Sequence, residues 1–242
     1  MEKYRSLHLW MIIPMVFMQL GIFMDYWGDF SRNAWSVHVH YWTGTAWYFF
    51  LIMQPYFATR GKMDKHRTYG IIGMFLAGAV CFTALSMMHR DIATTQRAVE
   101  FADRFGPFKP WFFFGVAAVE IVMMTAFGYA VIKSILNRKN LEDHAWWLIS
   151  TVFIIMMPAL GRGVQNVWIL VEGFSEDTNI MGGLYLSLVM ILTMLLITAW
   201  RFRKLKHPAT LLAAAVNLFC FLLEPLGKSE SIQGILITVI KG

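Results

Sequence analysis

Two residues of opposite charge, Glu120 and Arg162, lie in the middle of long apolar segments, where an ionised side chain is costly and usually has a function. Glu120 is nine residues after Trp111, where one apolar segment begins, and Arg162 is nine residues before Val171, where the next one ends. At a helical rise of about 1.5 Å per residue, both side chains are expected about 14 Å below the same membrane boundary. We therefore predict an ion pair between neighbouring helices.

Further polar and aromatic side chains are expected around this pair. Gln165 and Asn166 follow Arg162 by about one helical turn, and Tyr41 and Trp42 occur in the same half of another apolar segment. Together these residues predict a pocket that orients a small, mostly apolar ligand through a few polar groups. The alternative is a structural ion pair that fixes helix packing.

Four histidines stand near the ends of the apolar segments, where imidazole could bind haem iron or a metal ion. His40 and His89 are expected in the same half of the membrane as the charged pair. His66 and His144 are expected at the opposite edge, at matching depth on different helices. A hydrogen-bonded or solvated side chain is the alternative for each of them.

The elements that hold these residues follow from the composition. The chain has 242 residues, of which 57% are hydrophobic and only 15% are charged, more apolar surface than a soluble domain can bury. We predict an all-α fold, a single polytopic transmembrane bundle of six or seven helices. The expected spans are 9–26, 35–57, 68–88, 111–135, 146–171 and 182–200, with 209–225 as a possible seventh.

The net charge of +6 serves as a topology signal. Lysine and arginine are concentrated in the short segments 60–67 and 201–206, which the positive-inside rule places on the cytoplasmic side together with the N-terminus. We predict a multi-pass protein of a bacterial inner membrane. Its partners are the lipid bilayer and, in one hypothesis, other membrane-protein subunits, whereas nucleic acid is excluded.

One connection, 90–110, is longer than the others. It predicts either an ordinary amphipathic loop or a surface helix that lies on the outer interface or caps the bundle as a lid. In the second case Ile92, Val99, Ala102 and Phe105 would form its apolar face.

Five short motifs occur in a fixed order and resemble a bacterial integral-membrane family that is catalogued only as a domain of unknown function. The motifs are His40-x-x-x-Gly44, Gln54-Pro55, His66-Arg67-x-x-Gly70, His144-x-x-Trp147 and Arg162. Where that family has two arginines after the last histidine, this chain has Ala145 and Trp146. The resemblance implies a membrane helix bundle and no particular reaction.

Three functions fit these observations. The most specific is membrane electron transfer with a bound haem b or quinone, because histidines occur at both membrane edges. The others are a small-molecule binding or transport protein and an accessory subunit of a larger membrane complex. Phosphate-binding loops and nucleophile elbows are absent from the sequence, which assigns neither catalytic residues nor a metal site.

Overall fold

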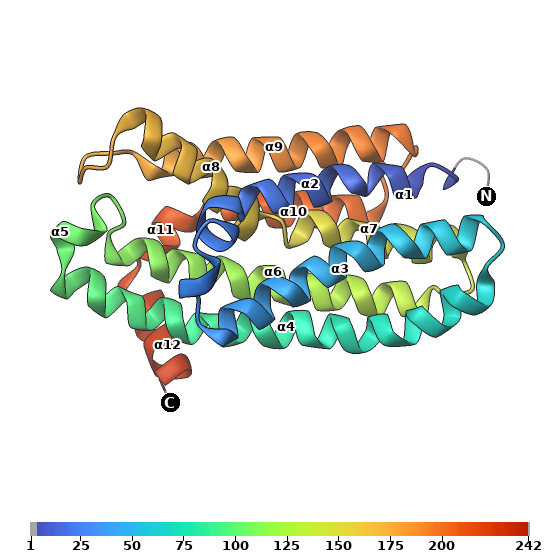
Figure 1. Ribbon diagram of the computed structural model, residues 1–242, viewed down its shortest axis with the longest axis horizontal. Helices are drawn as coiled ribbons and strands as arrows, with labels where there is room; N and C mark the ends of the chain where they lie inside the picture. The colour runs from blue at the N-terminus through green and yellow to red at the C-terminus, as the bar shows by residue number, and fades with distance from the viewer. Residues whose placement is uncertain (1–3, 242) are drawn as a thin grey trace.

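The computed structural model describes residues 4–241, and within them all regular secondary structure is helical. The long helices run side by side along one axis as a bundle (Figure 1). The elements are α1 (Leu7–Trp10), α2 (Ile12–Gly21), a π-helical turn (Phe23–Trp27), a 3-10 turn (Phe30–Arg32), α3 (Trp35–Thr59), α4 (Met63–Glu100), α5 (Ala102–Phe105), α6 (Pro110–Leu136), α7 (Leu141–Ile154), α8 (Met157–Glu172), α9 (Ile180–Arg201), α10 (Pro208–Cys220), α11 (Leu223–Lys228) and α12 (Glu230–Lys241).

Four helical segments in the described part of the chain are long and apolar enough to cross a membrane: α4, α6, α7 together with α8, and α9. Large apolar side chains also face outward, as on α4, where Phe75 and Phe82 are 77% and 75% exposed. Such a surface suits lipid contact. The all-helical bundle is thus confirmed, and its helices indicate a membrane protein.

Two of the predicted spans are interrupted. The first ends as an α-helix at Gly21 and continues as the π-helical turn, which includes Asp25. The segment 146–171 is broken between Ile154 and Met157. Pro158 follows this break directly and, because it has no backbone N–H, it produces the kink expected of a proline inside an apolar helix.

The prediction for 90–110 was wrong in both of its forms. Instead of a loop or a separate surface helix, α4 continues without interruption to Glu100. Its buried side chains there include Ile92 and Ala98, whereas Val99, expected on the apolar face, is 70% exposed. Ile92 packs in a cluster with residues of α6 and α12, which gives the extension an apolar partner that a local pattern does not contain.

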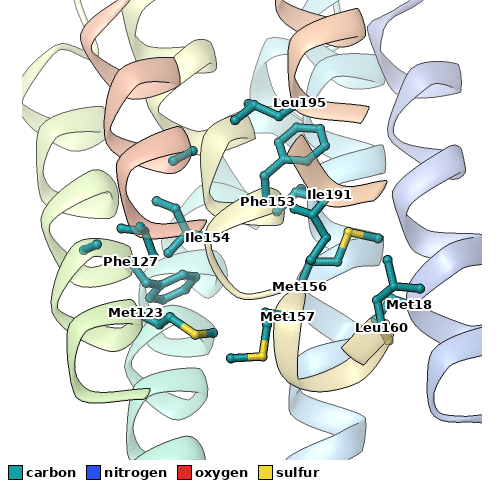
Figure 2. Close-up of a cluster of buried hydrophobic side chains, with 14 of the residues drawn as sticks. Met18, Met123, Phe127, Phe153, Ile154, Met156, Met157, Leu160, Ile191 and Leu195 are labelled. Atoms are coloured by element: carbon teal, nitrogen blue, oxygen red, sulfur yellow. The ribbon is translucent and has the colours of Figure 1, made fainter. Parts of the chain in front are cut away.

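A dry core surrounds the break between α7 and α8 (Figure 2). Met156 and Met157 lie at the break itself, and flexible methionine side chains fill irregular gaps of this kind. Buried side chains from α2, α6 and α9 complete the packing, among them Met18, Met123, Phe127, Ile191 and Leu195. Along α7 and α8, this core separates His144 at one end of the bundle from Arg162 toward the other.

Candidate functional site

A pocket opens near the end of the bundle at which the described chain begins. It contains about 580 Å³ of space that no protein atom fills, its open mouth included. Its lining is largely apolar, with Leu7, Leu51, Pro55, Ala58, Leu141 and Leu148. Two histidines, His66 and His144, also line it, and we call it the histidine pocket.

The two histidines come from α4 and α7, and the structure brings them together as the sequence predicts. Their ring centroids are 6.0 Å apart, and the ring planes are nearly perpendicular, at 88°. His144 Nδ1 lies 2.9 Å from the carbonyl oxygen of Ser134 on α6. Because a carbonyl oxygen only accepts, the hydrogen belongs on Nδ1, and Nε2 is left as an acceptor.

Two buried polar atoms in the lining of the histidine pocket have no hydrogen-bond partner. They are Nε2 of Gln54, a residue that is 3% exposed, and Nδ1 of His66, whose ring also lies close to the backbone of Gln54. In the described part of the chain, the three other such atoms, on His8, Trp168 and Asn217, belong to residues that do not line this pocket. An unpaired buried donor or acceptor costs about 1–3 kcal/mol, so two such atoms in one apolar pocket are what a ligand with matching polar groups would pair with.

A charged group stands at the edge of the same pocket. The carboxylate of Glu142 accepts a hydrogen bond of 3.1 Å from the hydroxyl of Tyr4 and one of 3.2 Å from the ammonium group of Lys204. Burial and the neighbouring Glu142 raise the pKa of the Tyr4 phenol, which therefore stays protonated and continues to donate. These contacts hold the start of the described chain against α7 and close one side of the pocket.

A second group of polar side chains surrounds Arg162, and we call it the arginine cluster. The Arg162 guanidinium donates a 2.7 Å hydrogen bond to the Tyr41 hydroxyl, and its Nε lies 3.6 Å from the Asp25 carboxylate. Asn166 donates to the same carboxylate over 2.7 Å. The side chain of Arg162 nevertheless keeps 48% of its surface accessible. The cluster is therefore internally paired but not sealed.

The predicted ion pair between Glu120 and Arg162 was wrong: no ion pair within 4 Å joins them in the described chain, and Arg162 is paired with Asp25 instead. Glu120 is only 7% exposed and lies within electrostatic range of Arg162 and of Asp91 on α4. Matching depth on two helices does not fix which way each side chain points around its helix. The π-helical turn brings Asp25 into the place expected for Glu120.

The other residues that the sequence predicts near Arg162 belong to two groups. His40 belongs to the cluster: it is half-buried, within electrostatic range of Arg162, and its Nδ1 is 3.4 Å from the Thr83 hydroxyl. Three residues make no hydrogen bond or ion pair with Arg162 or Asp25 in the described chain. His89 is exposed, Trp42 packs edge-on against Trp35, and Gln165 is buried with its amide donating toward the backbone of Ile180 over 3.4 Å.

The sequence motifs separate into the same two groups. Gln54, Pro55, His66 and His144 line the histidine pocket although they come from three helices, whereas His40 and Arg162 belong to the arginine cluster. Sequence reasoning about single residues missed Tyr4, Glu142 and Asp25, all of which lie near the ends of apolar segments. Gln54 had a signal, its place in a motif and at membrane depth, but was not predicted as a site residue.

Within the described residues, no group of three or more histidine, cysteine, aspartate or glutamate side chains is arranged to hold a metal ion. A haem with two axial histidines needs fewer protein ligands, and among the described residues His66 and His144 are the two histidines whose rings lie side by side. Comparison with models of known protein families, with curated protein sequences and with solved structures found no match.

Proposed function

We propose that this chain is a multi-pass membrane protein that binds a quinone-type ligand in the histidine pocket and takes part in membrane electron transfer. The observation that carries the proposal is the pair of unpartnered buried atoms, Gln54 Nε2 and His66 Nδ1, in one apolar pocket.

The chemistry of these two atoms narrows the ligand. An amide nitrogen only donates, so Gln54 requires an oxygen acceptor on the ligand. An imidazole nitrogen can donate or accept, so His66 can pair with a carbonyl oxygen or with a hydroxyl group. A quinone carries carbonyl oxygens on an apolar ring, and its reduction by two electrons and two protons converts these oxygens to hydroxyl groups. The same pocket can therefore pair with both redox states.

The apolar lining fits the rest of such a molecule. A ring and an isoprenoid tail gain free energy by leaving water or lipid headgroups for surfaces like those of Leu51, Pro55 and Leu148. The pocket thus combines an apolar wall with few polar groups, the mixture that ligand pockets usually show. His144, whose orientation is fixed through Ser134, would exchange protons at the ligand through Nε2.

Haem is the second candidate, and the histidine pair favours it. A histidine that ligates a metal commonly donates its other ring N–H to a backbone carbonyl, as His144 does to Ser134. His66 and His144 would be the axial ligands, and the bound iron would supply one-electron chemistry.

We also propose how many times the chain crosses the membrane and on which side its N-terminus lies. Six or seven crossings result if α1 with α2, α3, and α10 with α11 also span, and the N-terminus is then cytoplasmic in a bacterial inner membrane. The histidine pocket would lie at the cytoplasmic edge and the arginine cluster in the outer half. The proposal also includes membership of the uncharacterised membrane family that the motifs resemble. Four motif residues support it by lining the pocket: Gln54, Pro55, His66 and His144.

An absorption spectrum of the detergent-purified protein, followed by chromatography of its organic extract, tests the proposal. We expect no Soret band and about one quinone per chain, and we expect Gln54→Leu to retain less quinone than the wild type. A Soret band that disappears in His144→Leu would overturn the proposal in favour of haem. A colourless protein that neither carries nor binds a quinone would refute both and favour a binding or accessory role.

A further inference from the structure

The turn between α9 and α10 forms a basic hollow at the surface. Its lining consists of Trp200, Arg201, Arg203, Leu205 and Lys206, and its unfilled space is about 1070 Å³ where it opens outward. This hollow shares no lining residue with the histidine pocket. Its combination of cations and exposed apolar side chains requires a separate explanation.

Three of its residues are cations without an anionic partner. Arg201, Arg203 and Lys206 are exposed, and none of them has a carboxylate within 4 Å in the described chain. Lys204 differs, because it turns inward, is 14% exposed and pairs with Glu142. The turn therefore uses one cation to fix the fold and presents the other three to the surroundings.

The backbone at Arg203 provides a second, independent observation. Arg203 has a φ of 57° and is the one non-glycine residue with positive φ among those described. Hydrogen bonds from Lys204 N to Ala199 O (2.7 Å) and from Arg203 N to Trp200 O (3.1 Å) form a helix-ending motif in which this position usually holds glycine. A side chain retained in a strained conformation indicates a use for that side chain.

The apolar neighbours indicate what the cations bind. Trp200 is 70% exposed and Leu205 is 41% exposed, and Ile197, one turn earlier on α9, is 48% exposed. A free anion in water has no use for this apolar border, whereas a lipid places its phosphate over cations and its acyl chains along apolar side chains. Tryptophan is also the residue favoured at the level of lipid headgroups.

We propose that the turn between α9 and α10 binds the phosphate headgroup of an anionic phospholipid. Arg201, Arg203 and Lys206 contact the headgroup, and the acyl chains follow the exposed face of α9 beside Trp200. This site is independent of the ligand in the histidine pocket. Two contacts in the described chain connect the regions: Lys204, which neighbours Arg203 in the chain, pairs with Glu142 at the pocket edge, and Phe202 stacks on Tyr4 of the pocket lining.

The test uses the full-length, delipidated protein and measures its melting temperature during titration with phosphatidylglycerol, phosphatidylcholine or inorganic phosphate. We expect phosphatidylglycerol alone to raise the melting temperature. In Arg203→Gly the half-saturating lipid concentration should rise about fivefold, because one cation near an anionic lipid surface contributes about that factor. The same variant should melt no lower than the wild type without lipid, since glycine relieves the positive φ.

Arg138→Gln is the matched control, because it removes an exposed cation from the loop between α6 and α7 and should leave the lipid titration unchanged. The triple variant Arg201→Gln, Arg203→Gly, Lys206→Gln should lose the response altogether. An unchanged response in the triple variant, or an equal response to phosphatidylcholine, would overturn the proposal. An equal response to inorganic phosphate would replace the lipid by a free anion and overturn it as well.

Discussion

The histidine pocket and the arginine cluster share helix α3 but satisfy their polar groups differently. On α3, Gln54 lines the pocket and Tyr41 belongs to the cluster, 13 residues and about 20 Å apart along the helix. In the cluster, Arg162, Asn166 and Tyr41 find partners within the chain. In the pocket, Gln54 Nε2 and His66 Nδ1 find none.

Under the proposed function, this difference distinguishes the structural role of the cluster from the binding role of the pocket. Polar groups that pair with one another fix how helices pack, and they need no ligand to be stable. Unpaired polar groups destabilise the empty protein and are retained where something else pairs with them. Substitutions in the cluster should therefore lower stability, and substitutions in the pocket should lower ligand affinity.

The largest effect on stability is expected where α2 and α8 approach each other at the cluster. A Cβ atom added at Gly163 would overlap the backbone of Gly21, and a rigid backbone cannot give way cheaply. Gly163→Ala should therefore cost about 1–3 kcal/mol and separate Asp25 from Arg162. Gly128→Ala is the control, because its Cβ meets open space. Thermal unfolding in detergent measures both, and equal melting temperatures would contradict the close contact.

A smaller loss of stability is expected from the Arg162 side chain itself. Arg162→Gln leaves Asp25 without its cation, but because Arg162 is half accessible the cost should be only about 1 kcal/mol. Glu120→Gln should not lower stability, since it replaces a buried ionisable group that has no cation in direct contact by a neutral group of the same shape. If both variants and their combination were equally destabilised, Glu120 and Arg162 would be a direct pair after all.

A substitution of Gln54 in the histidine pocket should not lower stability. Gln54→Leu removes an unpaired buried amide and keeps a similar volume, so the ligand-free protein should be as stable as the wild type or up to about 1 kcal/mol more stable. Thermal unfolding of the ligand-free protein checks this. A loss comparable to that of Gly163→Ala would show that Gln54 is structural.

The smallest effect on stability is expected from lowering the pH, and it acts through His207 near the histidine pocket. His207 caps α10 by accepting from Ala209 N and lies 3.2 Å from Asp143. Burial is the main cause that lowers the pKa of His207, against the opposing hydrogen bond with Asp143. The unfolded chain therefore takes up the proton first, and stability should fall as the pH drops below about 6.5. Unfolding followed between pH 7 and 5 should show this slope, and His207→Gln should make it shallower.

The sequence predicts the helices far better than the contacts between them. Apolar segment length places most helix ends within a few residues, as for 111–135 against Pro110–Leu136. It also predicts the kink at Pro158 and the meeting of His66 and His144. These results depend on rise per residue and on local chemistry, which a single sequence contains.

The contacts that the sequence does not predict depend on how each side chain is oriented around its helix and on partners that are distant in the chain. Glu120 and Arg162 share a depth, yet only the π-helical turn decides that Asp25 contacts Arg162. The continuation of α4 to Glu100 depends on packing with α6 and α12. The sequence places Gln54 in a motif at membrane depth, but the absence of a hydrogen-bond partner for its Nε2 is visible only once the surrounding helices are in place.

The central claim, that the histidine pocket binds a quinone through Gln54 and His66, is tested most directly by an equilibrium titration with a short-chain benzoquinone, followed by tryptophan fluorescence. We predict that Gln54→Leu weakens binding about tenfold, the worth of one hydrogen bond of about 1.4 kcal/mol, and that Arg162→Gln leaves the affinity unchanged. Equal affinity in Gln54→Leu and the wild type, or loss of binding only in Arg162→Gln, would contradict the account.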